Sequence, residues 1–268
     1  MRDTAMTLTE HLAELRRRLL IAAAAVAAGA LAGFALYDVF LLDWIRAPFD
    51  ALAGRADNPF ANAQVLVHWL ALAPDPVPDS PINLHFFSPI EVFMVKLKVA
   101  LLAGVVLASP VVFGQLWGFV AAGLHEREKS VIKAFLPVSL LLFAVGIVLA
   151  WTLMLPLILY FLIFVTGEGL VPSIMLGKYA GLVAASCLSF GVVFQLPLVL
   201  FFLTRLGLVT PAFLAKQRPY AVLTCFILSA VLTPPDVVTQ SLMALPMIVL
   251  YEAGIVVSRF TAAPDEPR

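Results

Sequence analysis

Charged side chains are scarce in this sequence. Asp, Glu, Lys and Arg make up 13% of its 268 residues, whereas 62% are hydrophobic and the mean hydropathy is +1.00. Soluble domains carry about 25% charged residues. The scarcity of charge therefore excludes a soluble globular domain. A helix that crosses a bilayer needs about 20 apolar residues, so the composition predicts a membrane protein with several spans.

Cysteines and catalytic motifs are also few or absent. The two cysteines, Cys187 and Cys225, lie in apolar runs and are expected to be buried, forming neither a disulfide nor a metal site. The sequence contains no GxxxxGK[ST] loop, no HExxH motif and no GxSxG motif. No basic stretch interleaved with aromatic residues indicates nucleic-acid binding. We therefore expect no enzyme, no cofactor and no metal.

Long charge-free runs divide the chain. They predict one all-α membrane domain over residues 1–268, with six transmembrane helices at about 19–42, 92–124, 134–160, 179–204, 219–235 and 237–257. The first run is too long for a signal peptide and is expected to be retained. Residues 43–88 are expected to form a loop outside the bilayer. The third run continues to Gly167, about 50 Å of helix, so Pro137 and Pro156 are expected to divide it into a span and an interfacial piece.

The last two apolar runs are short. At about 1.5 Å per residue, Pro219–Pro235 and Val237–Tyr251 reach about 26 Å and 23 Å, less than the roughly 30 Å of a bilayer core. We expect the bilayer to thin beside them. The alternative is that flanking residues such as Glu252 and Arg259 extend to the interface, and that the bilayer keeps its thickness.

The distribution of Lys and Arg predicts the orientation. Six spans place both termini on one side of the membrane, and twelve of the 17 basic residues fall on that side. Both termini are therefore expected in the cytoplasm. The twelve residues are Arg2, Arg16, Arg17, Arg18, Arg127, Lys129, Lys133, Arg205, Lys216, Arg218, Arg259 and Arg268.

Two acidic residues stand out at the predicted cytoplasmic face. Over residues 8–19, helical spacing places His11, Glu14 and Arg18 on one face and four leucines on another, as in an amphipathic helix at the interface. Glu14 could simply pair with Arg18, a contact that contributes roughly 0.3–0.5 kcal/mol, and Glu126 could pair with Lys129 in the same way. Alternatively, the two carboxylates could bind two guanidinium groups of a ligand, since each accepts two parallel hydrogen bonds from an arginine.

Few polar side chains lie within the predicted spans. Gln115, Gln195 and Gln240 are expected to hydrogen-bond within the bundle or to a partner helix, because lipid cannot satisfy them. Asp236, which follows the sequence TPP, is expected to cap the last helix rather than to act directly.

A series of motifs runs in order along nearly the whole chain. They are HLAELRRRL (11–19), SPIEVF (88–93), SPVVFGQLWGFVAAGLHERE (109–128), FGVVFQLP (190–197), RPY (218–220) and TPPDVVTQSLMALPMIVLYE (233–252). Together they resemble the TatC family, the polytopic subunit of the twin-arginine protein translocase. The first and last motifs are the most specific, and the family's six spans and cytoplasmic termini agree with those predicted from charge.

The resemblance implies a receptor and scaffold in the bacterial cytoplasmic (inner) membrane. In the family, acids at the positions of Glu14 and Glu126 receive the arginine pair of a substrate's signal peptide, and residues at the positions of Arg16, Arg18 and Arg127 shape that patch. The positions that match structural or assembly residues of the family are Pro48, Pro110, Gln115 and Phe119.

The resemblance also implies partners. The polar positions Gln195, Asp236 and Gln240 would serve partner contacts, the last two near the docking surface for the single-span subunits TatB and TatA. The energy for moving a folded preprotein would come from the proton-motive force, and several copies of the chain would assemble in the complex.

Two positions depart from the family. Many members carry Glu where Gln195 stands, and because Gln cannot change its charge, a proton-linked role is not expected there. Ala150 stands where an aromatic residue is common.

Two other functions are open to a membrane protein of this composition, a secondary transporter and an intramembrane hydrolase. A secondary transporter needs ionisable groups near the midplane, often within repeated halves, but here the ionisable groups lie at the ends of the spans and no repeat is visible. An intramembrane serine hydrolase needs a base within the membrane. The four histidines all lie outside the predicted spans, namely His11, His68, His85 and His125.

Overall fold

The computed structural model describes residues 8–52, 83–122, 126–165, 173–232 and 236–260, and most of them are helical. The α-helices are α1 (Leu8–Leu36), α2 (Leu42–Leu52), α4 (Pro89–Ala122), α5 (Glu126–Leu149), α6 (Leu155–Tyr160), α7 (Leu176–Val193), α8 (Leu196–Arg205), α9 (Pro211–Lys216), α10 (Arg218–Leu232) and α11 (Val237–Arg259). Three π-helical segments continue or join them, η1 (Tyr37–Leu41), η3 (Ala150–Met154) and η4 (Phe161–Val165). The predicted all-α class is confirmed except for one short parallel pair, β1 (Asn83–His85) and β2 (Ser173–Met175).

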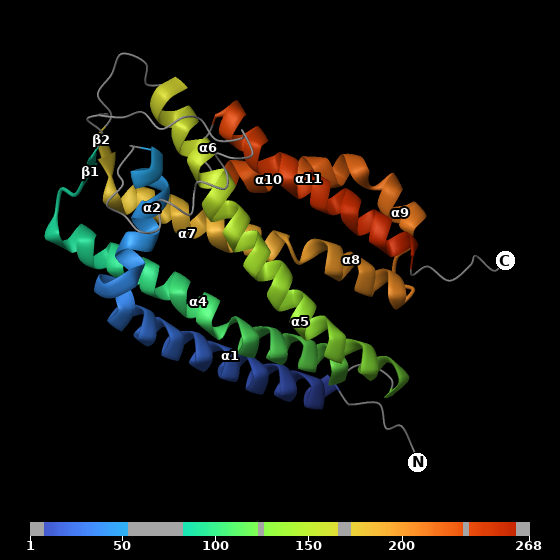
Figure 1. Ribbon diagram of the computed structural model, residues 1–268. Helices are drawn as coiled ribbons and strands as arrows, with labels where there is room; N and C mark the ends of the chain where they lie inside the picture. The colour runs from blue at the N-terminus through green and yellow to red at the C-terminus, as the bar shows by residue number, and fades with distance from the viewer. Residues whose placement is uncertain (1–7, 53–82, 123–125, 166–172, 233–235, 261–268) are drawn as a thin grey trace.

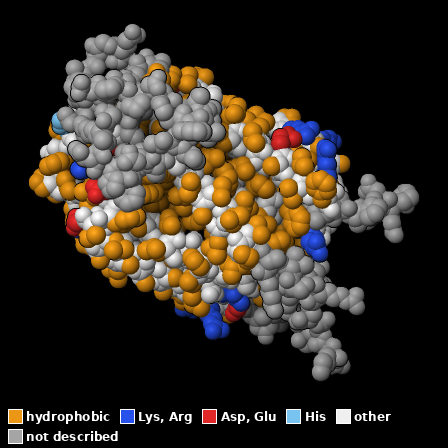
Figure 2. Space-filling view, viewed as in Figure 1, with side chains coloured by type: hydrophobic (Ala, Val, Ile, Leu, Met, Phe, Trp, Pro, Cys, Tyr) orange, Lys and Arg blue, Asp and Glu red, His pale blue; other side chains and the backbone are white. Residues whose placement is uncertain are grey.

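The helices form an elongated bundle (Figure 1). α1 and α4 lie side by side and antiparallel, α5 crosses α7, and α11 packs against both α8 and α10. The start of α1 and the end of α11 lie at one end of the bundle, and the β1–β2 pair lies at the other end. On the face shown in Figure 2, a broad hydrophobic surface separates charged groups near the two ends, as in a protein that crosses a bilayer.

Five helical stretches in the described chain are long and apolar enough to cross a membrane. They are His11–Asp50, Pro89–Ala122, Phe135–Ile163, Leu176–Arg205 and Val237–Arg259. The predicted fifth span corresponds to α10, an apolar helix of only 15 residues. The count of six spans and the orientation of the termini therefore stay predictions.

Pro137 and Pro156 do not divide the third run into a span and an interfacial piece, contrary to the sequence-based expectation. α5 runs through Pro137, and the helical path continues through η3, α6 and η4 to Val165. A membrane helix tolerates an interior proline because neighbouring groups and small local adjustments satisfy the freed carbonyl. Pro156 lies two residues after the end of η3. Proline has no N–H to donate to the preceding turn of a helix, and the wider π turn is the turn that precedes it.

Small residues let α1 and α4 approach closely. A β-carbon on Gly29 would lie 2.7 Å from the Gly104 carbonyl oxygen, and one on Gly104 would lie 2.5 Å from the Ala30 backbone nitrogen. Both positions therefore require glycine at this spacing, and the approach aligns the start of α1 with the end of α4.

The largest cluster of buried hydrophobic residues extends toward the end of the bundle that carries the β1–β2 pair (Figure 1). Trp44 on α2 stacks on Trp151 with ring centroids 5.7 Å apart, and the Trp151 Nε1 donates to the Trp44 carbonyl oxygen. The buried Tyr179 hydroxyl on α7 donates to the carbonyl oxygen of Ile45 at 2.6 Å. These bonds fasten the segment after α1 to α7 and to the third span.

Candidate functional site

The candidate site lies where the first turns of α1 meet the last turns of α4 (Figure 1). The rings of His11 and Phe119 stack there, with centroids 4.5 Å apart and an interplanar angle of 29°. This contact ties the start of α1 to α4. The structural or assembly role expected for Phe119 stays a prediction.

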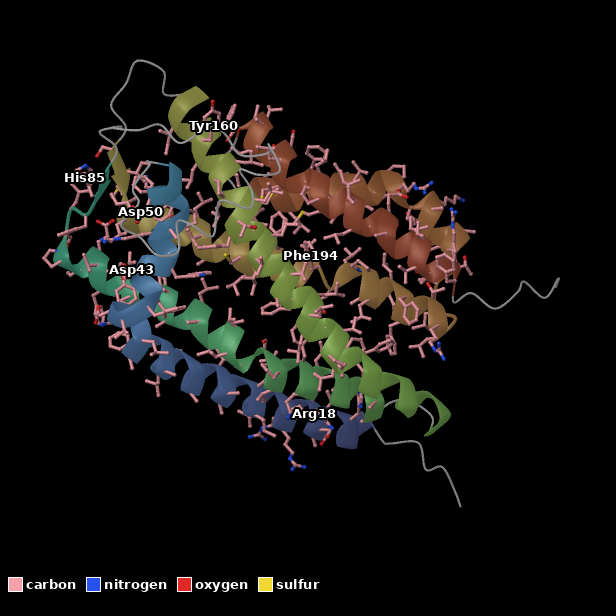
Figure 3. All side chains as sticks on the ribbon, viewed as in Figure 1. Arg18, Asp43, Asp50, His85, Tyr160 and Phe194 are labelled. Carbon is pink, nitrogen blue, oxygen red and sulfur yellow. The ribbon has the colours of Figure 1, made fainter. Side chains whose placement is uncertain are left out.

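Arg18 lies in a slot between the two helices, at the position labelled in Figure 3. Its Nε and Nη2 atoms are each 2.7 Å from Oε1 of Glu14, one turn earlier on α1. Its Nη1 lies 3.5 Å from the backbone carbonyl oxygen of Gln115 on α4. A β-carbon on Gly118 would lie only 2.0 Å from that Nη1, so glycine leaves the space that the guanidinium fills. We call Glu14, the Gln115 carbonyl and Gly118 the guanidinium slot.

The slot is partly buried on the polar face of α1. The Glu14 and Arg18 side chains are each 23% exposed, whereas Arg16 and Arg17 are exposed residues. The leucine face is exposed as well, at Leu12, Leu15 and Leu19. The predicted amphipathic segment is thus continuous with the first span, and its polar face contacts protein while its apolar face is left for lipid.

Glu126 and Arg127 are the first two residues of α5, and three residues separate them from the end of α4. α5 begins at the same end of the bundle as α1 (Figure 1). The side chains of both residues lie outside those that the structure describes. The predicted pairing of Glu126 with Glu14 in one site therefore stays a prediction.

The side chains of Gln195, Gln240 and Asp236 lie at helix contacts or helix ends, whereas Gln115 contributes its backbone carbonyl to the guanidinium slot. Gln195 stands at the break between α7 and α8, and its Nε2 donates to the Ser139 carbonyl oxygen on α5 at 3.0 Å. The Gln240 Nε2 donates to the Phe226 carbonyl oxygen, joining α11 to α10. Asp236 accepts the N–H groups of Val238 and Thr239 and so caps α11, as expected.

The two motif prolines lie inside helices, Pro48 buried in α2 and Pro110 exposed in α4. Among the described residues, no contact joins either proline to the guanidinium slot. Their expected structural role remains a prediction.

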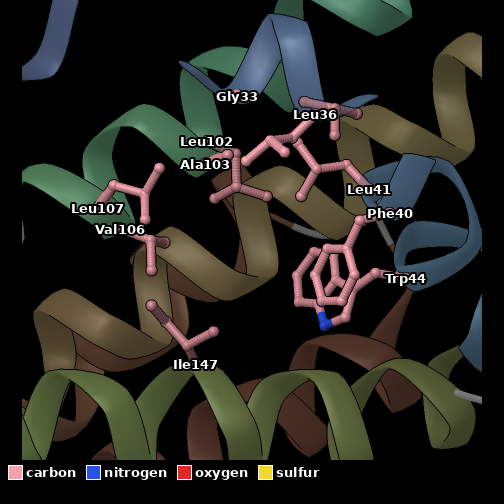
Figure 4. Close-up of a pocket in the computed structure, with 11 residues that line it drawn as sticks. Gly33, Leu36, Phe40, Leu41, Trp44, Leu102, Ala103, Val106, Leu107 and Ile147 are labelled. Carbon is pink, nitrogen blue, oxygen red and sulfur yellow. The ribbon is translucent and has the colours of Figure 1, made fainter. Parts of the chain in front are cut away.

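An apolar pocket of about 270 Å³ opens beside η1, far from the slot (Figure 4). Gly33, Phe40, Trp44, Ala103 and Ile147 are among its lining residues. Apart from the Trp44 indole, whose Nε1 is the lone side-chain donor, the lining is hydrocarbon, so the pocket offers nothing to hold a charged group. Among the described residues, no cluster of three or more His, Cys, Asp or Glu is placed to hold a metal ion.

Sequence reasoning found the pairing of Glu14 with Arg18 but missed Gly118 and the Gln115 carbonyl. Gly118 is a glycine inside an apolar span, which indicates a close approach of another chain segment. The sequence alone does not say which side chain fills the space.

Comparison with known proteins gives one result throughout. The family model for "Sec-independent protein translocase protein (TatC)" matches residues 10–246. The TatC protein of Carboxydothermus hydrogenoformans is 36% identical over 261 residues, 97% of this chain and 96% of that protein. TatCy of Bacillus subtilis is 33% identical, covering 97% of this chain and 91% of that protein.

The fold also matches a solved structure. A crystal structure described as twin-arginine translocase receptor TatC superposes with a TM-score of 0.74 and 30% sequence identity, covering 94% of this chain and 99% of that one. A second crystal structure of that receptor, in the detergent DDM, gives a TM-score of 0.76 and 31% identity.

Proposed function

The chain belongs to the TatC family of Sec-independent protein translocase components, and on that basis we propose that it is the translocase subunit that receives twin-arginine signal peptides. It is a multi-pass protein of the bacterial inner membrane and not an enzyme. Family membership sets aside the solute-transporter and hydrolase alternatives.

The observation that carries the proposal is the guanidinium slot. Glu14 supplies a carboxylate and Gln115 a backbone carbonyl, both hydrogen-bond acceptors, at a partly buried position. Arginine presents five N–H donors in a planar fork, so such a set of acceptors suits it better than it suits lysine. Partial burial strengthens a charge-assisted hydrogen bond relative to one in water.

In this proposal Glu14 and Glu126 each bind one arginine of the signal peptide. Arg16, Arg18 and Arg127 shape the patch and keep other cations away. The apolar part of the signal peptide then lies along the spans.

The partners proposed are single-span subunits of the TatA and TatB type, with the proton-motive force as energy source and several copies of this chain in the complex. Support comes from α10 and the start of α11, where the side chains of Val231 and Val237 are 79% and 80% exposed. We propose that a partner helix packs there, near Asp236 and Gln240. The Gln195, Asp236 and Gln240 side chains already bond within this chain, so their part would be to hold that surface in shape.

The test is equilibrium binding of a fluorescent twin-arginine signal peptide to the protein in lipid nanodiscs. We expect Glu14→Gln and Glu126→Gln each to weaken binding at least tenfold, since each removes a charge-assisted acceptor. Glu252→Gln is the matched control, because Glu252 forms a two-bond pair with Arg218 away from the slot. Unchanged affinity in both test variants would refute the proposal.

A further inference from the structure

The guanidinium slot already contains a guanidinium, that of Arg18. The group is held by Glu14 on its own helix, by a carbonyl oxygen on α4, and by the space above Gly118. Each of these features would serve an arginine arriving on another polypeptide equally well. An incoming arginine therefore meets an occupied site.

The hydrogen bonds that Arg18 makes in the slot are weaker than those an arginine can make there. Both its Nε and its Nη2 contact the same Glu14 oxygen, Oε1, so the pair is not the two-oxygen fork that makes arginine–carboxylate pairs strong. The Nη1 distance of 3.5 Å to Gln115 is at the long limit for a hydrogen bond. A guanidinium free to choose its approach can contact both carboxylate oxygens and shorten the bond to the carbonyl.

We propose that Arg18 is a resident competitor for the guanidinium slot, which an arginine of the signal peptide must displace before it can bind Glu14. This inference rests on the function proposed above. The role differs from that of an ordinary anchor, because removing Arg18 strengthens ligand binding instead of weakening it. A competitor of this kind sets the minimum affinity that a signal peptide needs, and so excludes weak cationic sequences.

The size of the effect follows from the occupied fraction of the slot. When a site is open for only part of the time, the measured dissociation constant rises by the reciprocal of that part. Partly exposed pairs at this helical spacing shift such an equilibrium by about two- to fivefold. Because the competitor acts before the ligand enters, twin-arginine and twin-lysine peptides gain by the same factor when it is removed.

The experiment measures the dissociation constant of a synthetic twin-arginine signal peptide on the full-length protein in nanodiscs. Arg18→Gln is expected to tighten binding about two- to fivefold. Arg17→Gln is the matched control, since it removes the same charge from an exposed neighbour and is expected to change binding less. Arg18→Lys keeps the charge but loses the planar fork, and is expected to show a smaller gain than Arg18→Gln.

Gly118→Ala shows whether competitor and ligand share one space. Its β-carbon would fill the position next to the Arg18 Nη1, so the gain from Arg18→Gln is expected to disappear in the double variant. Thermal unfolding of each variant is the control for helix packing, and an unchanged Tm is expected for Arg18→Gln and Arg17→Gln.

The outcomes separate the two claims. If Arg18→Gln and Arg18→Lys bind no more tightly than Arg17→Gln, or if the gain survives Gly118→Ala, the competitor role is wrong. If Glu14→Gln retains full affinity in the Arg18→Gln background, the proposed use of Glu14 itself is wrong.

Discussion

Single polar side chains between helices hold this membrane protein in register. Tyr179, Trp151 and Gln240 each donate to a backbone carbonyl oxygen on a neighbouring segment. No water is available in the bilayer interior, so polar groups there must be satisfied by bonds within the protein. Arg18 makes a longer contact of this kind, 3.5 Å to the Gln115 carbonyl oxygen, at the end of the bundle.

Tyr179→Phe tests one of these bonds. Removing the buried hydroxyl leaves the Ile45 carbonyl without this donor, so we expect a loss of about 1 kcal/mol of unfolding free energy and a lower Tm. The measurement is thermal unfolding in detergent. Tyr220→Phe is the control, because Tyr220 is 69% exposed. An equal Tm for both variants would contradict the expectation.

For single residues, the sequence predicted the contacts between side chains or backbone groups that lie within one helical turn of each other. Residues 14 and 18 are one helical turn apart, so their pairing follows from the helix alone. The Asp236 cap follows for the same reason. Gly118 and the Gln115 carbonyl belong to α4, 97 residues or more from Arg18 along the chain, and their part in the slot depends on how two helices pack.

Among the helices, the α1–α4 pair determines the geometry of the site. Gly104→Ala is expected to destabilise the protein by roughly 1–3 kcal/mol, because its β-carbon would lie 2.5 Å from the Ala30 backbone nitrogen and the helices must separate. Gly114→Ala, in the same helix, would add a carbon that meets no atom of a neighbouring described segment within 4 Å, and it is expected to be neutral or stabilising. Unfolding in a denaturant series distinguishes the two; similar stabilities would contradict this account of the close approach.

The short helix α10 predicts a thinner bilayer beside it. Its 15 residues span about 23 Å. We expect a spin label at Val231 to lie close to the headgroups, with strong relaxation by an aqueous reagent, and one at Leu107 on α4 to be shielded. Equal shielding at the two sites would mean that the bilayer keeps its full thickness.

Sequence patterns predicted the long helices well because apolar runs of that length have few other structures available in a bilayer. They failed at Pro137, because a proline's effect depends on neighbours that satisfy the freed carbonyl. They also missed the β1–β2 pair, which joins residues 90 positions apart in the chain and has no local signal.

For the whole molecule, topology is the first prediction to check. A membrane-impermeant maleimide is expected to label His85→Cys from outside intact cells, and Arg17→Cys only after the membrane is opened. The reason is that the side with more Lys and Arg is expected to face the cytoplasm. The native cysteines are both buried, so the background is low. Labelling of both positions in intact cells would contradict the predicted orientation.

A double-mutant cycle between receptor and signal peptide is the most direct test of the central claim. The cycle combines Glu14→Gln with Arg→Gln at each of the two peptide arginines, and binding is measured in nanodiscs. The account predicts a coupling of about 1.5 kcal/mol or more between Glu14 and one of those arginines. Additive effects at both arginines would show that Glu14 does not contact the arginine pair, and would contradict the account.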